Sequence, residues 1–117
     1  MDILVNDKLD SIYSVANLMH SPVIVSGSID RTIKFWDLQK ESLKNSITSL
    51  ASCKAIAISN DDKIFISGHI DGTIKVWDVN DGSLIKEIKD IHKQPIQSLE
   101  ISPDSKYLLS NSKYAII

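Results

Sequence analysis

The chain has 117 residues, enough for one ordinary domain, and its 43% hydrophobic and 24% charged residues are typical of a folded protein. Its net charge is −2, and its cationic residues are scattered lysines apart from Arg31, so the basic stripe of a nucleic-acid-binding surface is missing. The single cysteine, Cys53, excludes an intrachain disulfide and favours an intracellular, cytoplasmic protein.

Two segments near the N-terminus stand out from the rest of the sequence, one as a candidate strand and one as a long uncharged stretch. Residues 2–5 are a candidate lone strand ahead of the rest of the fold. The stretch from Ser11 to Ile29 carries no charge and has the length of a membrane span. Its five serines, together with Asn17, His20 and Pro22, are too polar for hydrocarbon, so we predict no membrane segment.

Short runs of β-branched and aromatic residues, separated by turn signals, follow along the chain. We predict strands at 12–17, 23–27, 32–37 and 42–47, then at 54–58, 64–68, 73–78 and 83–88, and finally at 96–101, 107–110 and 113–117. The dipeptide Asp71–Gly72 suits a two-residue hairpin turn that needs positive φ angles. Apolar residues at helical spacing are nowhere sustained, so we expect almost no helix.

These strands belong to an internal repeat. The segment from Val23 to Leu43 and the segment from Ile64 to Leu84 share 11 of 21 residues at a spacing of 41. A partial third copy relates Ile58–Ser67 to Ile101–Ser110 at a spacing of 43. Repeats of this length indicate stacked units of a few strands each.

The common core, Ser-Gly-x-x-Asp-x-Thr-Ile-Lys-x-Trp-Asp, resembles the WD-repeat β-propeller family, in which each blade has four antiparallel strands. The resemblance implies an all-β fold with about three blade-like units, too few for one chain to close a ring. The approximate units are 8–48, 49–91 and a truncated 92–117, with 2–5 as a possible detached outer strand.

The resemblance also implies structural roles for the polar motif residues. In the family, the Trp of each blade joins a hydrogen-bonded set with a Ser or Thr, an Asp in the tight turn and a His from the preceding loop. The positions that match are Trp36, Asp37, Trp77, Asp78, the turn residues Asp30 and Asp71, the hydroxyls Ser26 (or Ser28) and Ser67, and His92. We therefore interpret Ser, His and Asp as parts of the fold rather than as a catalytic triad.

Some positions depart from the family pattern. The equivalents of His92 in the second and first units are Ser49 and Lys8, so no unit holds the complete set. We expect these units to be less tightly fixed than ideal blades. Arg31 stands where the second unit has Gly72, which predicts about 1 kcal/mol of strain if the positive φ is kept.

An open array of about three units exposes the apolar faces of its end units. Three explanations stay open: a piece of a longer propeller protein, a homodimer that closes a six-bladed ring, or another protein that supplies the missing blades. The chain ends at Tyr114–Ile117, where a Trp-Asp pair should soon follow, and this favours a fragment or a degenerate short paralogue, with the homodimer second.

The function implied by the resemblance is a non-catalytic scaffold or adaptor that binds other proteins or peptides. Candidate partner-binding positions lie in loops at one end of the units, namely Arg31, Ser49, Lys54, His69, Ile70 and Lys93. The alternatives are the propeller portion of an enzyme or a phospho-ligand-recognition protein. The sequence shows neither clustered ligands for a metal or cofactor nor the grouped arginines that phosphate binding favours.

Overall fold

The computed structural model describes residues 12–89 and 92–112, and the regular structure in these residues is antiparallel β-sheet. The predicted all-β fold of blade-like units is therefore confirmed. The predicted strands at 2–5 and 113–117 lie outside the described residues. In the part of the chain that is described, no helix has the length and apolar character needed to cross a membrane.

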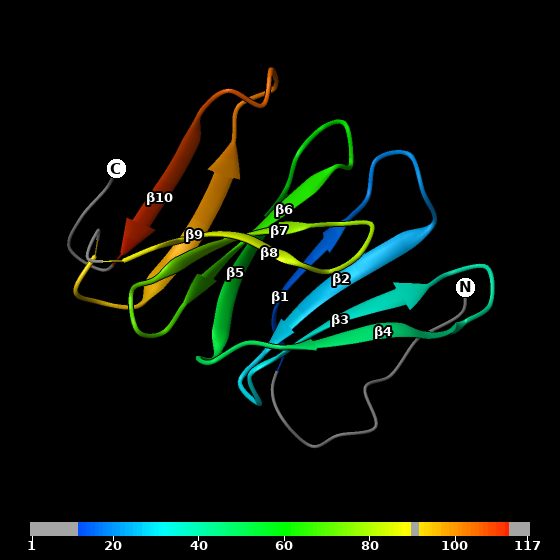
Figure 1. The fold of residues 1–117 in the computed structure, drawn as a ribbon, viewed down its shortest axis with the longest axis horizontal. Helices are drawn as coiled ribbons and strands as arrows, with labels where there is room; N and C mark the ends of the chain where they lie inside the picture. Colours follow the sequence, from blue (N-terminus) through cyan, green and yellow to red (C-terminus); the bar gives the residue numbers. More distant parts are fainter. Residues whose placement is uncertain (1–11, 90–91, 113–117) are drawn as a thin grey trace.

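Within the described residues, ten strands form three sheets, which Figure 1 shows in chain order. The first unit contains β1 (Ile12–Asn17), β2 (Val23–Ser28), β3 (Thr32–Asp37) and β4 (Ser42–Thr48), paired in that order. The second contains β5 (Cys53–Ile58), β6 (Ile64–His69), β7 (Ile74–Asp78) and β8 (Leu84–Ile88), and the third contains β9 (Ile96–Ile101) and β10 (Leu108–Ser112). The three sheets stand side by side, and the described strands do not close into a ring.

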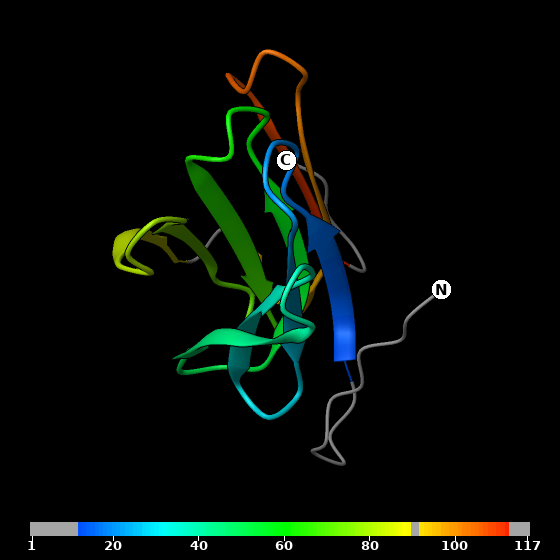
Figure 2. The same cartoon turned by 90° about the vertical axis from the view of Figure 1, so that its right-hand side faces the viewer.

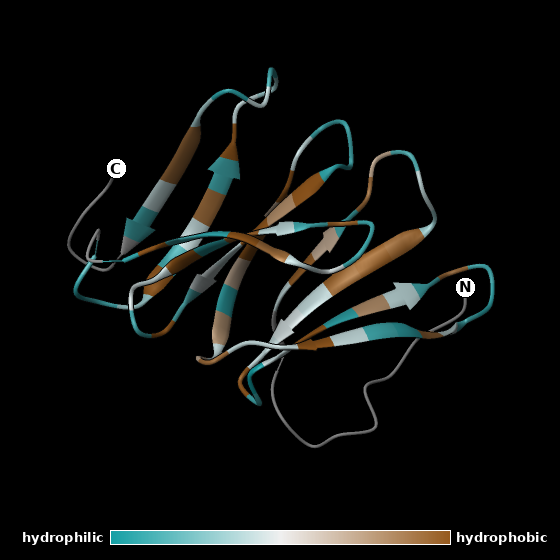
Figure 3. Cartoon of the chain, in the orientation of Figure 1, coloured by the Kyte–Doolittle hydropathy of each residue, from teal (hydrophilic) through white to brown (hydrophobic). Residues whose placement is uncertain are grey.

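The innermost strands β1, β5 and β9 are neighbours, whereas β4 and β8 lie on the opposite side of the molecule (Figure 2). Strand β4 is exposed at every position except Ile47, and Figure 3 shows mostly hydrophilic residues along it. Strand β9 instead buries Ile96 and Leu99 in the apolar layer toward the second unit and exposes the polar residues between them. The core therefore lies between the inner strands of successive units.

Two apolar layers join the three units. Between the first and second units, Phe35 contacts Phe65 edge to face, with ring centroids 5.3 Å apart, and Phe65 stacks on Trp77. Between the second and third units, Ile74 packs with Ile96 and other aliphatic side chains. Each sheet is thus held by its neighbour through side chains on facing surfaces.

The motif glycines Gly27 and Gly68 allow this close approach. Each lies inside a strand, and a Cβ built on Gly27 would be 2.4 Å from the Sγ of Cys53 in the next unit. A Cβ on Gly68 would be 2.4 Å from the Cγ2 of Ile96 in the unit after that. A larger residue at either position would push two units apart.

The turn between β6 and β7 differs from the predicted two-residue hairpin. The Gly72 N–H donates to the carbonyl of His69, which closes a four-residue turn with Gly72 at a φ of 84°. A turn of this kind followed by a left-handed residue is the usual longer hairpin connection. Arg31 occupies the same place in the first unit with a φ of 69°, so the predicted positive φ is present at an arginine.

Candidate functional site

The connections at one end of the sheets form a continuous surface, which we call the loop face (residues 29–31, 49–52, 70–73 and 92–95). The backbone N–H and the hydroxyl of Ser49 donate to the carbonyl of Arg31, at 2.8 and 3.1 Å. The hydroxyl of Ser52 donates to the carbonyl of Ile29 at 2.7 Å, and the Ile70 N–H donates to the carbonyl of Ser52. These hydrogen bonds join loops of two units into one fixed surface.

Three large aliphatic side chains are exposed on this loop face. The exposed fractions are 40% for Ile29, 85% for Leu50 and 45% for Ile70. Ile70 is a candidate from the sequence and Leu50 lies in the candidate loop between Ser49 and Lys54, whereas Ile29 is not among the candidates. The signal available in the sequence was a large apolar residue inside a segment whose neighbours predict a loop. Exposed apolar side chains on a rigid surface are the usual anchors of protein contacts.

The other candidate loop residues fall into two groups. Arg31 and Lys93 are exposed on the loop face. Lys54 is half-buried and lies in β5 rather than in the loop before it. Ser49 is 2% exposed and His69 is fully buried, so these two side chains are not available to a partner and their assignment to exposed loop positions is wrong.

His69 instead completes a hydrogen-bonded chain inside the second unit. Trp77 donates its indole N–H to the Ser67 hydroxyl at 2.8 Å, and the Ser67 hydroxyl lies 2.7 Å from Nε2 of His69. Nδ1 of His69 lies 3.0 Å from the carbonyl of Ala51. Because that carbonyl only accepts, Nδ1 carries the proton and Nε2 accepts from Ser67. The expectation that the second unit lacks a histidine in this set is therefore wrong, since a histidine from β6 takes the place left by Ser49.

The neutral form of His69 matches this chain of donors and acceptors. Burial lowers the pKa of His69 below its usual 6.5. A protonated ring would direct a second N–H at a hydroxyl that already donates to it. The site is therefore a structural clamp between the Trp77 strand and the loop face.

The first and third units contain shorter versions of the same clamp. Trp36 donates its indole N–H to Ser26 at 2.9 Å, which decides between the two candidate serines of that unit. In the third unit, Nε2 of His92 lies 3.1 Å from the Ser110 hydroxyl. Nδ1 of the buried His92 has no hydrogen-bond partner among the described residues.

The motif aspartates close turns. Asp71 accepts hydrogen bonds from the N–H and hydroxyl of Thr73, and Asp30 does the same with Thr32. Burial by itself raises the pKa of the Asp71 carboxyl, but the hydrogen bonds from Thr73 outweigh burial and the pKa is lowered.

The last aspartate of each motif caps the following turn. Asp37 accepts from the N–H groups of Gln39 and Lys40. Asp78 accepts from those of Asn80 and Asp81. These carboxylates fix the backbone geometry of the turns that follow β3 and β7.

The described residues also contain few groups suited to catalysis. Within 12–89 and 92–112, no three His, Cys, Asp or Glu side chains are placed together to hold a metal ion. Cys53 is fully buried, and burial raises the pKa of its thiol to about 12. A thiol with that pKa is protonated at neutral pH and is a poor nucleophile.

Comparison with known families agrees with this geometry. A family model described as WD domain, G-beta repeat matches residues 6–37 and 41–78, more than half of the chain. This chain belongs to the WD40 repeat family. The WD40 matches include both Trp-Asp pairs, at Trp36–Asp37 and Trp77–Asp78. The predicted membership is confirmed, and WD repeats generally mediate contacts between proteins.

A curated relative shares the repeat. Autophagy-related protein 16 of Arabidopsis thaliana is 34% identical to this WD40 chain over 90 residues. The alignment covers 77% of this chain and 18% of the relative. The chain therefore spans less than a fifth of that relative's length, and the likeness concerns the repeat region.

Proposed function

We propose that this WD40 chain is a non-catalytic scaffold whose loop face binds another protein. The observation that carries the proposal is the set of exposed aliphatic side chains Ile29, Leu50 and Ile70 on loops tied together by backbone hydrogen bonds. A preformed surface loses little conformational freedom on binding, so apolar contacts made there contribute efficiently to affinity. Arg31 adds a planar cation at the same surface.

The polar residues of the repeat support a binding role over a catalytic one. Ser67 and His69 have the composition of a catalytic pair, but their donors and acceptors are used by Trp77 and Ala51 in a buried clamp. Recognition of phosphorylated ligands usually uses several arginines, and the chain contains Arg31 alone. The net charge of −2 favours a protein partner over a nucleic acid.

The relative's name connects that protein with autophagy. Because the alignment covers 18% of the relative, we carry over to this chain none of that protein's partners or activity.

The test compares partners captured by the full chain and by surface variants. Leu50→Asp and Ile70→Asp place a charge on the loop face, and Leu84→Asp is a matched control because Leu84 is 46% exposed on the outer strand β8. Proximity labelling with quantitative mass spectrometry should show one set of proteins lost with both loop-face variants and kept with the control. A capture profile that all three variants leave unchanged would contradict the proposal. Catalytic turnover that Asp71→Ala abolishes without unfolding the chain would also contradict it.

The outer faces of the end units are a second candidate for protein contact, as sites where a second copy completes a six-bladed ring. Val15 matches Ile56, which packs toward the first unit, and Val15 is 57% exposed. Leu109 matches Ile66, which packs toward the third unit, and Leu109 is 52% exposed. Light scattering on the purified chain tests this arrangement: a discrete species of twice 13.0 kDa supports it, and a monomer or a polydisperse sample contradicts it.

A further inference from the structure

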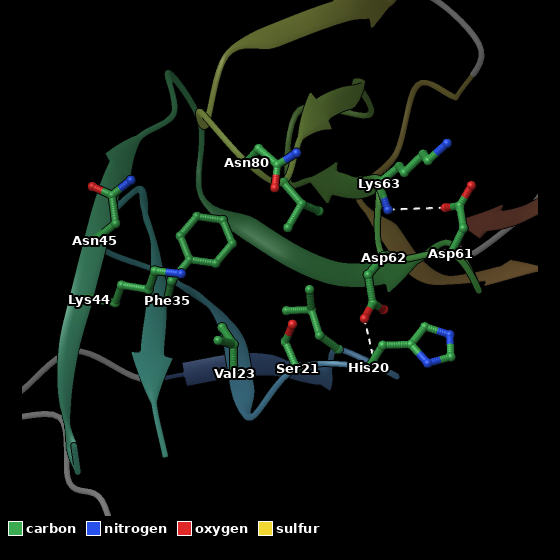
Figure 4. A pocket seen from close by; sticks show the side chains of 12 residues that line it. His20, Ser21, Val23, Phe35, Lys44, Asn45, Asp61, Asp62, Lys63 and Asn80 are labelled. Carbon is green, nitrogen blue, oxygen red and sulfur yellow. Dashed lines mark hydrogen bonds between the residues drawn. The ribbon is translucent and has the colours of Figure 1, made fainter. Parts of the chain in front are cut away.

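A pocket of about 320 Å³ lies between the first and second units, at the end of the sheets opposite the loop face (Figure 4). It is lined by the β1–β2 and β5–β6 connections, by β3 and β4, and by the residues that follow β7. Its volume is at the lower end of the range for ligand sites, which suits a short segment rather than a large cofactor. None of the motif residues described above lines it.

The floor of the pocket is apolar and fixed. Leu18, Val23 and Phe35 line the pocket, and each is at most 8% exposed, because each belongs to the core layer between the two units. The edge-to-face contact with Phe65 holds the Phe35 ring in place. Val79 lines the pocket from the second unit. A floor built from core residues keeps its shape without a ligand.

A β-bulge brings two polar residues of β4 to the rim. The register between β3 and β4 pairs Phe35 with Asn45 and Trp36 with Leu43, so Lys44 is an extra residue. A bulge of this kind directs two successive side chains to one side of the strand. Lys44 and Asn45 both line the pocket, and Figure 4 shows the Lys44 side chain directed toward the Phe35 ring.

The acidic groups near the pocket are already engaged. The two carboxylate oxygens of Asp62 accept the N–H groups of Met19 and His20, at 2.7 and 2.6 Å, which also ties the two units together. Asp61 accepts from the Ser59 hydroxyl and from the Lys63 N–H, and its side chain points away from Phe35 in Figure 4. The Asp62 carboxylate is thus directed at backbone N–H groups, and the Asp61 carboxylate is directed away from the apolar floor.

The rim groups that remain favour an anion and a peptide backbone. In the described part of the chain, the Lys44 ammonium makes no hydrogen bond or ion pair. The side-chain amide of Asn80, across the pocket from Asn45, makes no hydrogen bond to a described residue either. An amide can pair with both N–H and C=O groups of an extended peptide. An unpaired cation beside an apolar floor complements a carboxylate next to an aliphatic side chain.

We propose that this pocket between the first two units binds a short extended peptide segment of a partner protein, with an aliphatic side chain against Phe35 and an adjacent carboxylate beside Lys44. The site is separate from the loop face, so a partner can engage both ends of the scaffold. Peptide binding in this pocket does not depend on the loop face being a binding surface.

The proposal is tested with the full chain and a defined probe, the acetylated and amidated peptide Gly-Leu-Asp-Gly, in a titration followed by amide NMR shifts. Saturable shifts are expected at Val23, Asn45 and Val79. The Gly-Leu-Asn-Gly peptide removes the charge and should bind about threefold to fivefold more weakly, which is the usual contribution of an exposed ion pair. The Gly-Ala-Asp-Gly peptide removes the apolar contact and should bind at least about tenfold more weakly.

Two exposed lysines provide the matched variants. Lys44→Glu should weaken binding of Gly-Leu-Asp-Gly about tenfold or more, because a repulsive charge replaces an attractive one. Lys86→Glu, on the outer strand of the second unit and away from the pocket, should leave the Kd unchanged. Equal Kd values for the three peptides, equal effects of the two lysine variants, or no saturable shift in the pocket would overturn the proposal. Leu50→Asp should not affect this peptide, so failure here and failure of the loop face are distinguishable.

Discussion

The contact between Gly27 and Cys53 offers a sharp test of how the units pack. In the structure, a Cβ at position 27 would lie 2.4 Å from Sγ of Cys53, 3.0 Å from its Cβ and 3.2 Å from Cδ1 of Ile56. Gly27→Ala must therefore displace the inner strand of the second unit. Overpacking of this kind costs about 1–3 kcal/mol, whereas the lower entropy of the unfolded alanine chain returns about 0.4–1 kcal/mol.

The expected net loss for Gly27→Ala is about 1–2 kcal/mol in the free energy of unfolding. Cys53→Ala removes a buried atom and leaves a small cavity, for a loss of about 1 kcal/mol. In the double variant, the new methyl group occupies the space that Sγ leaves. We therefore expect the double variant to lose only about 1 kcal/mol, which is a favourable coupling of at least about 1 kcal/mol between the two sites.

The measurement is urea-induced unfolding of the wild type, both single variants and the double variant, followed by tryptophan fluorescence. Gly27→Ala combined with Ile96→Val is the control, since Ile96 belongs to the third unit and packs against Gly68 rather than Gly27. That control pair should be additive within about 0.5 kcal/mol. Additivity of Gly27→Ala with Cys53→Ala would refute the inferred close approach.

Three further predictions follow from the buried polar groups and turns. Burial lowers the pKa of His69 in the folded state, so the stability that the neutral ring contributes is complete above about pH 6.5 and is lost as the pH falls toward the folded-state pKa. Urea unfolding from pH 7.5 to 5 should show the free energy of unfolding decline by up to about 1.4 kcal/mol per pH unit. His69→Gln should flatten this pH dependence. The Cys53 thiol, with a pKa of about 12, should react with a disulfide reagent at pH 8 only in urea; rapid reaction of the native chain would show that it is not enclosed. Arg31→Gly should raise the free energy of unfolding by about 1 kcal/mol because it relieves a φ of 69° at a residue with a Cβ, and an unchanged or lower midpoint in urea would argue against strain there.

The repeat and the strands were predictable because they depend on neighbouring residues. Period-two patterns and turn residues determine where a strand begins and ends, and the predicted 12–17 and 96–101 coincide with β1 and β9. The spacing of 41 residues identified the family without any structure. The positive φ of Arg31 was also predictable, because the matching turn contains Gly72.

The candidate site was only partly predictable. The sequence indicated which loops share one end of the sheets, but it did not separate exposed from buried side chains in them. Leu50 and His69 lie in or beside predicted loops, yet one is 85% exposed and the other is fully buried. The difference arises because the His69 ring contacts Ser67 on its own strand and Ala51 in the loop before β5, and the second contact depends on how β5 and β6 pair rather than on local pattern.

The sequence alone therefore determined the secondary structure, the repeat and the family of this chain. Only the tertiary structure decided what the motif glycines, the second-unit histidine and the pocket between units do. Each of these depends on contacts between sheets: Gly27 on Cys53, His69 on Ala51, and the pocket on a bulge that turns Lys44 toward Phe35. Such contacts arise when whole sheets pack together, and the local preferences of a segment do not specify which side chains meet between two sheets.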